Sequence, residues 1–193
     1  MVNYVSELKR TTAVKASIES ELKVASDIQM GMIPRVFPPF PERKDIDLYA
    51  LMTPAKVVGG DLYDYFLQNE RLYFCVGDVS GKGIPAAMFM AITRDLFRII
   101  AQQNRSPWEI ATMMNNFLVK DNDQSMFVTM FIGMVDLPKG RLEYCNCGHN
   151  VPILDGKFLE MGSTNQPLGL WECKALFGDR DRKSGSAGMP RPI

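Results

Sequence analysis

The sequence of 193 residues has little of several features that mark specialised classes of protein. It has no excess of either charge, with 22 basic and 22 acidic residues, whereas a dedicated nucleic-acid-binding protein carries a basic excess. Its apolar runs, such as residues 86–92, are far shorter than the roughly 20 residues that span a membrane. The N-terminus has no apolar signal-peptide core. We therefore expect a soluble cytoplasmic protein with no membrane span and no nucleic-acid partner.

Cysteine and histidine are also scarce, and the 4 cysteines do not form a disulfide framework in a chain of this size. Cys145, Cys147 and His149 are spaced at i, i+2 and i+4, which on a strand places them on one face as metal ligands. The alternative is a half-buried strand that uses cysteine as a small apolar residue. We favour this alternative, because structural zinc sites usually offer four ligands.

The first 30 residues contain neither glycine nor proline. Apolar residues recur there at steps of three and four, namely Val14, Ile18, Leu22, Ala25, Ile28 and Met32. The spacing predicts an amphipathic linker helix within residues 1–33 that is stopped by Gly31 and Pro34. Its apolar stripe is as narrow as a coiled-coil seam, so the helix could pair with a second copy in a homodimer or connect to an upstream sensor. The alternative is that it packs back on the domain.

Beyond residue 34 the pattern changes from strands to helices and back to strands. Alternating or strand-forming runs predict strands at 46–52, 71–76, 127–135, 142–145, 151–154 and 157–161. One helix is predicted from Pro85, with an apolar face of Met88, Ile92, Leu96, Ile99 and Ile100. A second helix starts at Ser106 as N-cap, and Glu109 completes a capping box. Two adjacent helices between antiparallel strands favour an α+β fold over alternating βαβ units.

Two glycine-aspartate segments carry the candidate chemistry, Gly59–Asp64 and Gly77–Gly83. Glycine lets the backbone approach a ligand closely, and the carboxylates of Asp61 and Asp78 offer the hard oxygen ligands that Mg²⁺ and Mn²⁺ prefer. The alternative is a pair of ordinary turns in which each aspartate bonds its own backbone. The second segment lacks the spacing of a nucleotide-binding P-loop.

Taken in order, these segments resemble the SpoIIE-like branch of the PPM (type 2C, metal-dependent) Ser/Thr protein phosphatases. The resemblance spans about residues 21–172. The matching blocks are Glu21–Ala25 with Ile28, Gln29 and Pro34, then Gly59–Asp64, Gly77–Gly83, Phe127–Phe131, Gly148–Asn150 and Pro167–Leu170.

The resemblance implies an antiparallel β-sandwich flanked by helices in α-β-β-α layers, over residues 34–172. It also implies a centre of two Mn²⁺ or Mg²⁺ ions, with Asp61 and Asp78 as catalytic metal ligands and the carbonyl of Val79 as a further ligand. Asp78 would bridge the two ions. Paired ions activate a water and clamp the phosphate for in-line displacement, so that no covalent intermediate is needed. The implied partner is a phosphorylated regulatory protein, such as an anti-sigma-factor antagonist.

Three further residues in the matching blocks are left with alternatives. Asp64 either supports the metal site or lies in a surface turn. For His149 and Asn150 we favour a structural loop over a role in proton transfer.

The resemblance ends before the end of the sequence. Family members continue after Pro167–Leu170 with a strand ending in Thr-Asp-Gly, a helix and a final acidic ligand, whereas residues 173–193 form an irregular tail here. We therefore expect a sandwich that is incomplete at the C-terminus, with weak binding of the second cation. The alternative function is a catalytically deficient regulatory or protein-binding module that retains the phosphatase fold.

Overall fold

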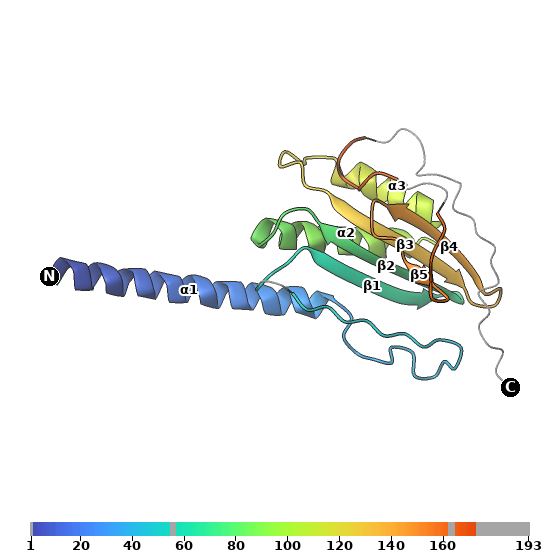
Figure 1. Ribbon diagram of the computed structural model, residues 1–193, viewed down its shortest axis with the longest axis horizontal. Coiled ribbons are helices and arrows are strands. Elements are labelled where there is room, and N and C mark those ends of the chain that lie inside the picture. Colours follow the sequence, from blue (N-terminus) through green and yellow to red (C-terminus); the bar gives the residue numbers. More distant parts are fainter. Residues whose placement is uncertain (1, 55–56, 162–164, 173–193) are drawn as a thin grey trace.

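A four-stranded antiparallel sheet forms the centre of the computed structural model, which describes residues 2–54, 57–161 and 165–172 (Figure 1). The strands are hydrogen-bonded in chain order and comprise β1 (Asp61–Gln68), β2 (Arg71–Val79), β3 (Val128–Asp136) and β4 (Arg141–Cys147). Asp61 pairs with Asp78, and Asp78 pairs with Thr129 on the next strand. These three residues therefore meet at one end of the sheet.

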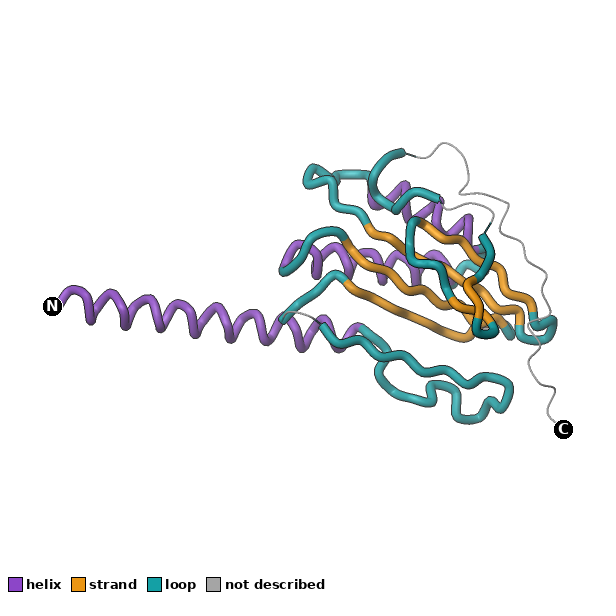
Figure 2. Tube along the Cα trace, in the orientation of Figure 1, coloured by secondary structure: helices purple, strands orange, loops and turns teal. Residues whose placement is uncertain are grey.

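Two helices cover one face of this sheet, α2 (Ile84–Ala101) and α3 (Pro107–Leu118), as Figure 2 shows. The predicted capping box of α3 is confirmed, because a Glu109 carboxylate oxygen accepts hydrogen bonds from the backbone N–H (2.9 Å) and the hydroxyl (2.6 Å) of Ser106. The core between helices and sheet includes Leu62, Tyr73, Met90, Phe97, Ile110, Met114, Met130 and Ile132.

The predicted apolar face of α2 is largely wrong. Met88, Ile92 and Ile99 are 64%, 54% and 61% exposed, whereas Met90 and Phe97 are fully buried. Apolar residues surround most of this helix, so their spacing alone does not select the stripe that meets the sheet. The contact with the sheet makes that selection.

The other face of the sheet carries a small hairpin of β5 (Ile153–Leu154) and β6 (Lys157–Phe158). Its turn is the predicted one, since Asp155 and Gly156 both have positive φ, at 50° and 75°. The predicted strand at 46–52 does not form, and these residues lie in a loop. Alternation gives a segment two faces, but a strand also needs a hydrogen-bonding partner. The expected α+β class is confirmed. In the described residues, the face of the sheet away from the helices is covered by this hairpin and by the loop that contains residues 46–52.

The predicted N-terminal helix is present as α1 (Val2–Met32), which projects from the rest of the molecule (Figure 1). It continues through Gly31, where we had expected it to stop. Its C-terminal end is attached to the domain, because the Gln29 side chain donates to the Gly59 carbonyl (2.6 Å) and accepts from the Gly59 N–H (3.1 Å). None of the helices in the described ranges is long and apolar enough to cross a membrane.

A buried ion cluster joins β1 to α2. Asp64 is 1% exposed, and its carboxylate accepts hydrogen bonds from the guanidinium group of Arg98, one of them 2.8 Å long. Arg94 Nε lies 3.1 Å from the same carboxylate. The surface-turn alternative for Asp64 is therefore wrong. Its side chain points to the helical face of the sheet and fixes α2 there.

We expect Asp64→Asn to destabilise the protein by about 3 kcal/mol, because it removes the buried counter-charge of Arg98 and leaves Arg94 with only the exposed Asp95. Urea unfolding followed by circular dichroism measures this change. Glu70→Gln is the matched control, since it removes an exposed ion pair with Arg43 and should change the stability very little. Equal effects of the two substitutions would contradict the structural role of Asp64.

Candidate functional site

Asp61 and Asp78 lie side by side on adjacent strands at one end of the sheet. Asp61 is the first residue of β1, and Asp78 is the penultimate residue of β2. Directly opposed residues of antiparallel strands project to the same face, and the exposure of both aspartates identifies it as the face away from the helices. Both residues therefore belong to strands, and the alternative of two ordinary turns is not supported.

The adjacent carboxylates affect each other electrostatically. Partial burial and the neighbouring charge of Asp61 raise the pKa of Asp78 above its ordinary value. The nearby His149 acts in the opposite direction and lowers this pKa. Two like charges in contact favour the uptake of a proton or a cation.

The backbone at Gly60, the residue before Asp61, packs closely against the backbone of Val79, the residue after Asp78. Gly60 accepts a hydrogen bond from the Val79 N–H (3.3 Å), and a Cβ atom at residue 60 would lie only 2.8 Å from the Val79 carbonyl oxygen. Only glycine fits this close approach. The side chain of Val79 is buried, so the backbone is the part of this residue that can serve a ligand.

Thr129, which the sequence did not single out, and His149, for which the sequence favoured a structural loop, border the same site. Thr129 lies opposite Asp78, and its hydroxyl is 3.3 Å from the Asp78 carbonyl and 3.0 Å from His149 Nδ1. His149 follows β4, and buried Asn146 anchors it by accepting from its N–H (2.7 Å) and donating to its carbonyl (2.9 Å). Burial lowers the pKa of His149 even though the two aspartates raise it. The Gly148-His149-Asn150 sequence, which follows a predicted strand, is the feature of the sequence that points to His149 as a residue of this site.

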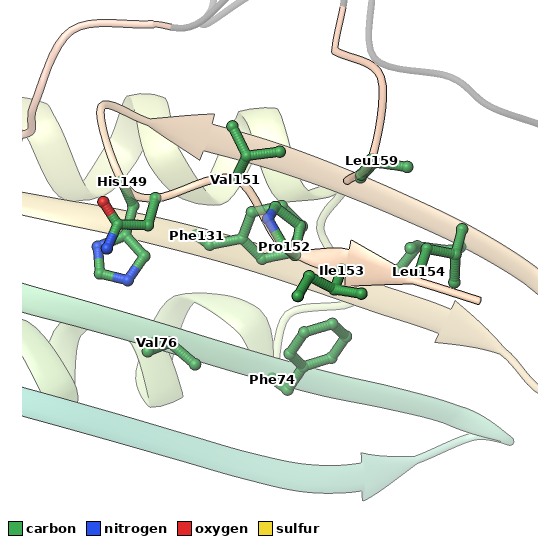
Figure 3. A pocket seen from close by; sticks show the side chains of 11 residues that line it. Phe74, Val76, Phe131, His149, Val151, Pro152, Ile153, Leu154 and Leu159 are labelled. Atoms are coloured by element: carbon green, nitrogen blue, oxygen red, sulfur yellow. The ribbon is translucent and has the colours of Figure 1, made fainter. Parts of the chain in front are cut away.

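The two aspartates and His149 open into a cavity of about 370 Å³. Its polar wall is formed by Asp61, Asp78, His149 and Asn150, and its apolar wall includes Leu51, Met52, Tyr63 and Val76. An apolar groove of about 410 Å³ continues from His149 along the sheet beneath the hairpin (Figure 3). Phe74, Phe131 and Ile153 line this groove. The site thus combines a charged end with an extended apolar surface.

The three cysteines that the structure describes, Cys75, Cys145 and Cys147, are buried and do not line this site. Cys145 and Cys147 are 1% and 0% exposed, with their sulfur atoms 3.8 Å apart. They belong to the hydrophobic core, as the favoured alternative predicted. Among the residues that the structure describes, no group of three or more histidine, cysteine, aspartate or glutamate residues has the geometry of a metal site. Two carboxylates and nearby backbone carbonyls are the oxygen donors that the structure brings together.

Comparison with solved structures identifies the fold as that of the PP2C-type phosphatases. The chain superimposes on the SiaA-PP2C domain of Pseudomonas aeruginosa with a TM-score of 0.64 and 22% identity, over 81% of this chain and 65% of that one. It also matches RsbX in complex with magnesium, with a TM-score of 0.51 and 19% identity, over 67% of this chain and 66% of RsbX.

Sequence comparison gives the family. The model of the SpoIIE family, stage II sporulation protein E, matches residues 68–178, and the chain belongs to this family. The match includes Asp78 and begins after Asp61. The phosphoserine phosphatase RsbU of Bacillus subtilis is 28% identical over an alignment of 161 residues, and the match covers 81% of this chain and 47% of RsbU. The chain therefore spans about half the length of this relative.

We expect Asp78→Asn to stabilise the fold at neutral pH in the absence of divalent cations. Because the folded state holds a proton on Asp78 more readily than the unfolded state does, the free energy of unfolding falls as the pH rises from 3.8 through the raised pKa. The Asp78→Asn variant has no ionisable group at residue 78, so its free energy of unfolding does not fall in this way.

Urea unfolding in EDTA measures the difference between the two proteins. At pH 7 the variant should be more stable by up to about 1 kcal/mol, a small gain because Asp78 is partly solvated, and at about pH 3 the gain should disappear. A gain that is the same at both pH values would show that the charge of Asp78 does not cause it.

Proposed function

We propose that this chain is a metal-dependent phosphoprotein phosphatase that hydrolyses phosphoserine or phosphothreonine. The observation that carries the proposal is the pairing of Asp61 with Asp78 at the mouth of a cavity, in a member of the SpoIIE family. The relative RsbU is named as a phosphoserine phosphatase, which supports this class of reaction.

The donor set suits Mn²⁺ or Mg²⁺, because both prefer carboxylate, carbonyl and water oxygen. In this proposal Asp61, Asp78 and the carbonyl of Val79 would hold the cation. Such a cation lowers the pKa of water and clamps a phosphate for in-line attack. The described residues supply a donor set for one cation, and a second cation would need ligands from outside the described residues.

The residues around the carboxylates position the substrate. Gly60 allows the backbone of β1 to lie close to the Val79 carbonyl, and Asn150 lies on the polar wall with His149. The apolar wall and the adjoining groove fit the peptide that carries the phosphate better than a small sugar phosphate. The proposed substrate is therefore a phosphorylated regulatory protein such as an anti-sigma-factor antagonist. A cytoplasmic location belongs to the same proposal.

The alternative function is a catalytically deficient regulatory or protein-binding module with the phosphatase fold. It is favoured by the small number of carboxylates that the described residues bring together. The division of the chain into a linker helix at 1–33, a phosphatase domain at 34–172 and a tail at 173–193 stays a prediction. Residues 173–193 lie outside the described residues.

We expect hydrolysis of p-nitrophenyl phosphate to rise with added Mn²⁺ and to fall at least about 100-fold in Asp78→Asn, because a carboxylate that holds the cation is lost. The measurement is kcat/KM across a Mn²⁺ titration. Lys44→Gln, an exposed residue outside the cavity, is the control. Folded protein without Mn²⁺-dependent turnover would favour the regulatory module.

We also propose that α1 forms a homodimer with a second copy of the chain. Val14, Ile18 and Ile28 are 52%, 51% and 65% exposed on a helix that projects from the domain (Figure 1). Burial of these apolar side chains against a partner would lower the free energy of the protein. A parallel partner helix would cover them at the spacing of a coiled-coil seam.

Light scattering during size-exclusion chromatography should give twice the chain mass of 21.7 kDa. We expect Ile18→Glu to shift the mass toward the monomer, because it places a charge in the seam, whereas Lys23→Gln on the opposite face should not. A strictly monomeric unsubstituted protein would rule out the homodimer.

A further inference from the structure

His149 has the position of a substrate-binding residue, although the sequence favoured a structural role for it. It is the only histidine in the chain, and its ring stands over the sheet where the charged cavity meets the apolar groove (Figure 3). The backbone of His149 is fixed on both sides by Asn146, which is 0% exposed. Its place beside the two aspartates is therefore built into the end of β4.

The ring is oriented through one of its two nitrogens. Nδ1 lies 3.0 Å from the Thr129 hydroxyl, which itself lies 3.3 Å from the Asp78 carbonyl. The hydroxyl has one hydrogen, which it can donate to Nδ1 or to that carbonyl. In either arrangement Nδ1 is engaged, so Nε2 is the ring nitrogen that remains for a ligand in the cavity. When the hydroxyl donates to Nδ1, Nε2 carries the hydrogen of the neutral ring.

We propose that His149 is a catalytic residue whose Nε2–H donates a hydrogen bond to the bridging oxygen of the phosphomonoester. This inference rests on the proposed phosphatase function. Thr129 is the positioning residue that holds the ring, and the proposal takes the arrangement in which its hydroxyl donates to Nδ1, so that Nε2 carries the hydrogen. The role differs from that of Asp61 and Asp78, because it acts on the substrate rather than on a cation.

The hydrogen bond acts where negative charge develops. The oxygen of the attacking water forms a bond to phosphorus, and the bond from phosphorus to the serine or threonine oxygen breaks. Its electron pair goes to that oxygen, a proton of the water completes the alcohol, and the other product is inorganic phosphate. A donor aimed at the leaving oxygen stabilises this charge before the proton arrives, and loss of one such donor typically costs about 100-fold or more in kcat.

Two substitutions separate this role from a structural one. His149→Asn retains a polar atom near the position of Nδ1 but removes Nε2, whereas the amide of His149→Gln reaches toward the position of Nε2. The measurement is kcat and KM with a series of aryl phosphates whose leaving phenols differ in pKa.

We expect His149→Asn to lose about 100-fold in kcat with the poorest leaving groups and little with the best, and His149→Gln to recover part of the loss. An equal loss with all leaving groups, or unchanged rates, in an active unsubstituted protein would overturn the role of His149 and leave the phosphatase function intact.

A second readout does not depend on turnover. Because the chain has a single histidine, all ¹⁵N imidazole signals can be assigned to His149. Inorganic phosphate added with Mg²⁺ should shift the Nε2 signal far more than the Nδ1 signal. A shift that is complete with Mg²⁺ alone would place His149 on the cation and overturn the proposal, as would the absence of any shift with phosphate.

The two experiments keep the two proposals distinguishable. An unsubstituted protein without Mn²⁺-dependent hydrolysis would contradict the proposed function. If phosphate then still shifted Nε2, the contact between His149 and phosphate would stand as a binding interaction, and the catalytic role would be overturned.

Discussion

The antiparallel register between β1 and β2 is the constraint on which the rest of this structure depends. Side chains alternate between the two faces of a strand, so a slip of one residue would exchange every inward and outward position. The observed register places Asp61 beside Asp78 on the open face. It also places Asp64, three residues further along β1, on the helical face, where the arginines of α2 hold it. One pairing thus sets both the candidate site and the anchor of the helix.

The two faces of the sheet consequently have different physical roles. The helical face is lined by buried apolar side chains, and Asp64, the one buried carboxylate among the described residues, is neutralised there by two guanidinium groups. The open face brings two carboxylates together without a basic residue between them. Such an arrangement stabilises the fold poorly but is suited to a cation. The two carboxylates of the candidate site therefore add little to stability, while the buried cluster on the other face holds their strand in place.

The segments that follow the strands add what the sheet alone lacks. The turn after β4 places His149 over the carboxylates, and the hairpin beyond it borders the apolar groove. Thr129 links this turn to β2 through one hydroxyl. At the other end of the chain, Gln29 ties α1 to Gly59, only two residues before Asp61. A change in how α1 packs is thus connected to the site by a short stretch of backbone.

The sequence by itself determined the elements whose signals are local. The capping box at Ser106, the Asp155-Gly156 turn, the long N-terminal helix and the two glycine-aspartate segments all depend on neighbouring residues, and local sequence patterns predict each of them. Tertiary structure decided the rest. It selected which stripe of the apolar α2 is buried, left residues 46–52 without a strand partner, and turned Asp64 away from Asp61. It also brought His149 to Asp78 from 71 positions away in the chain. These outcomes depend on contacts between distant segments, and no local pattern encodes which segments will meet.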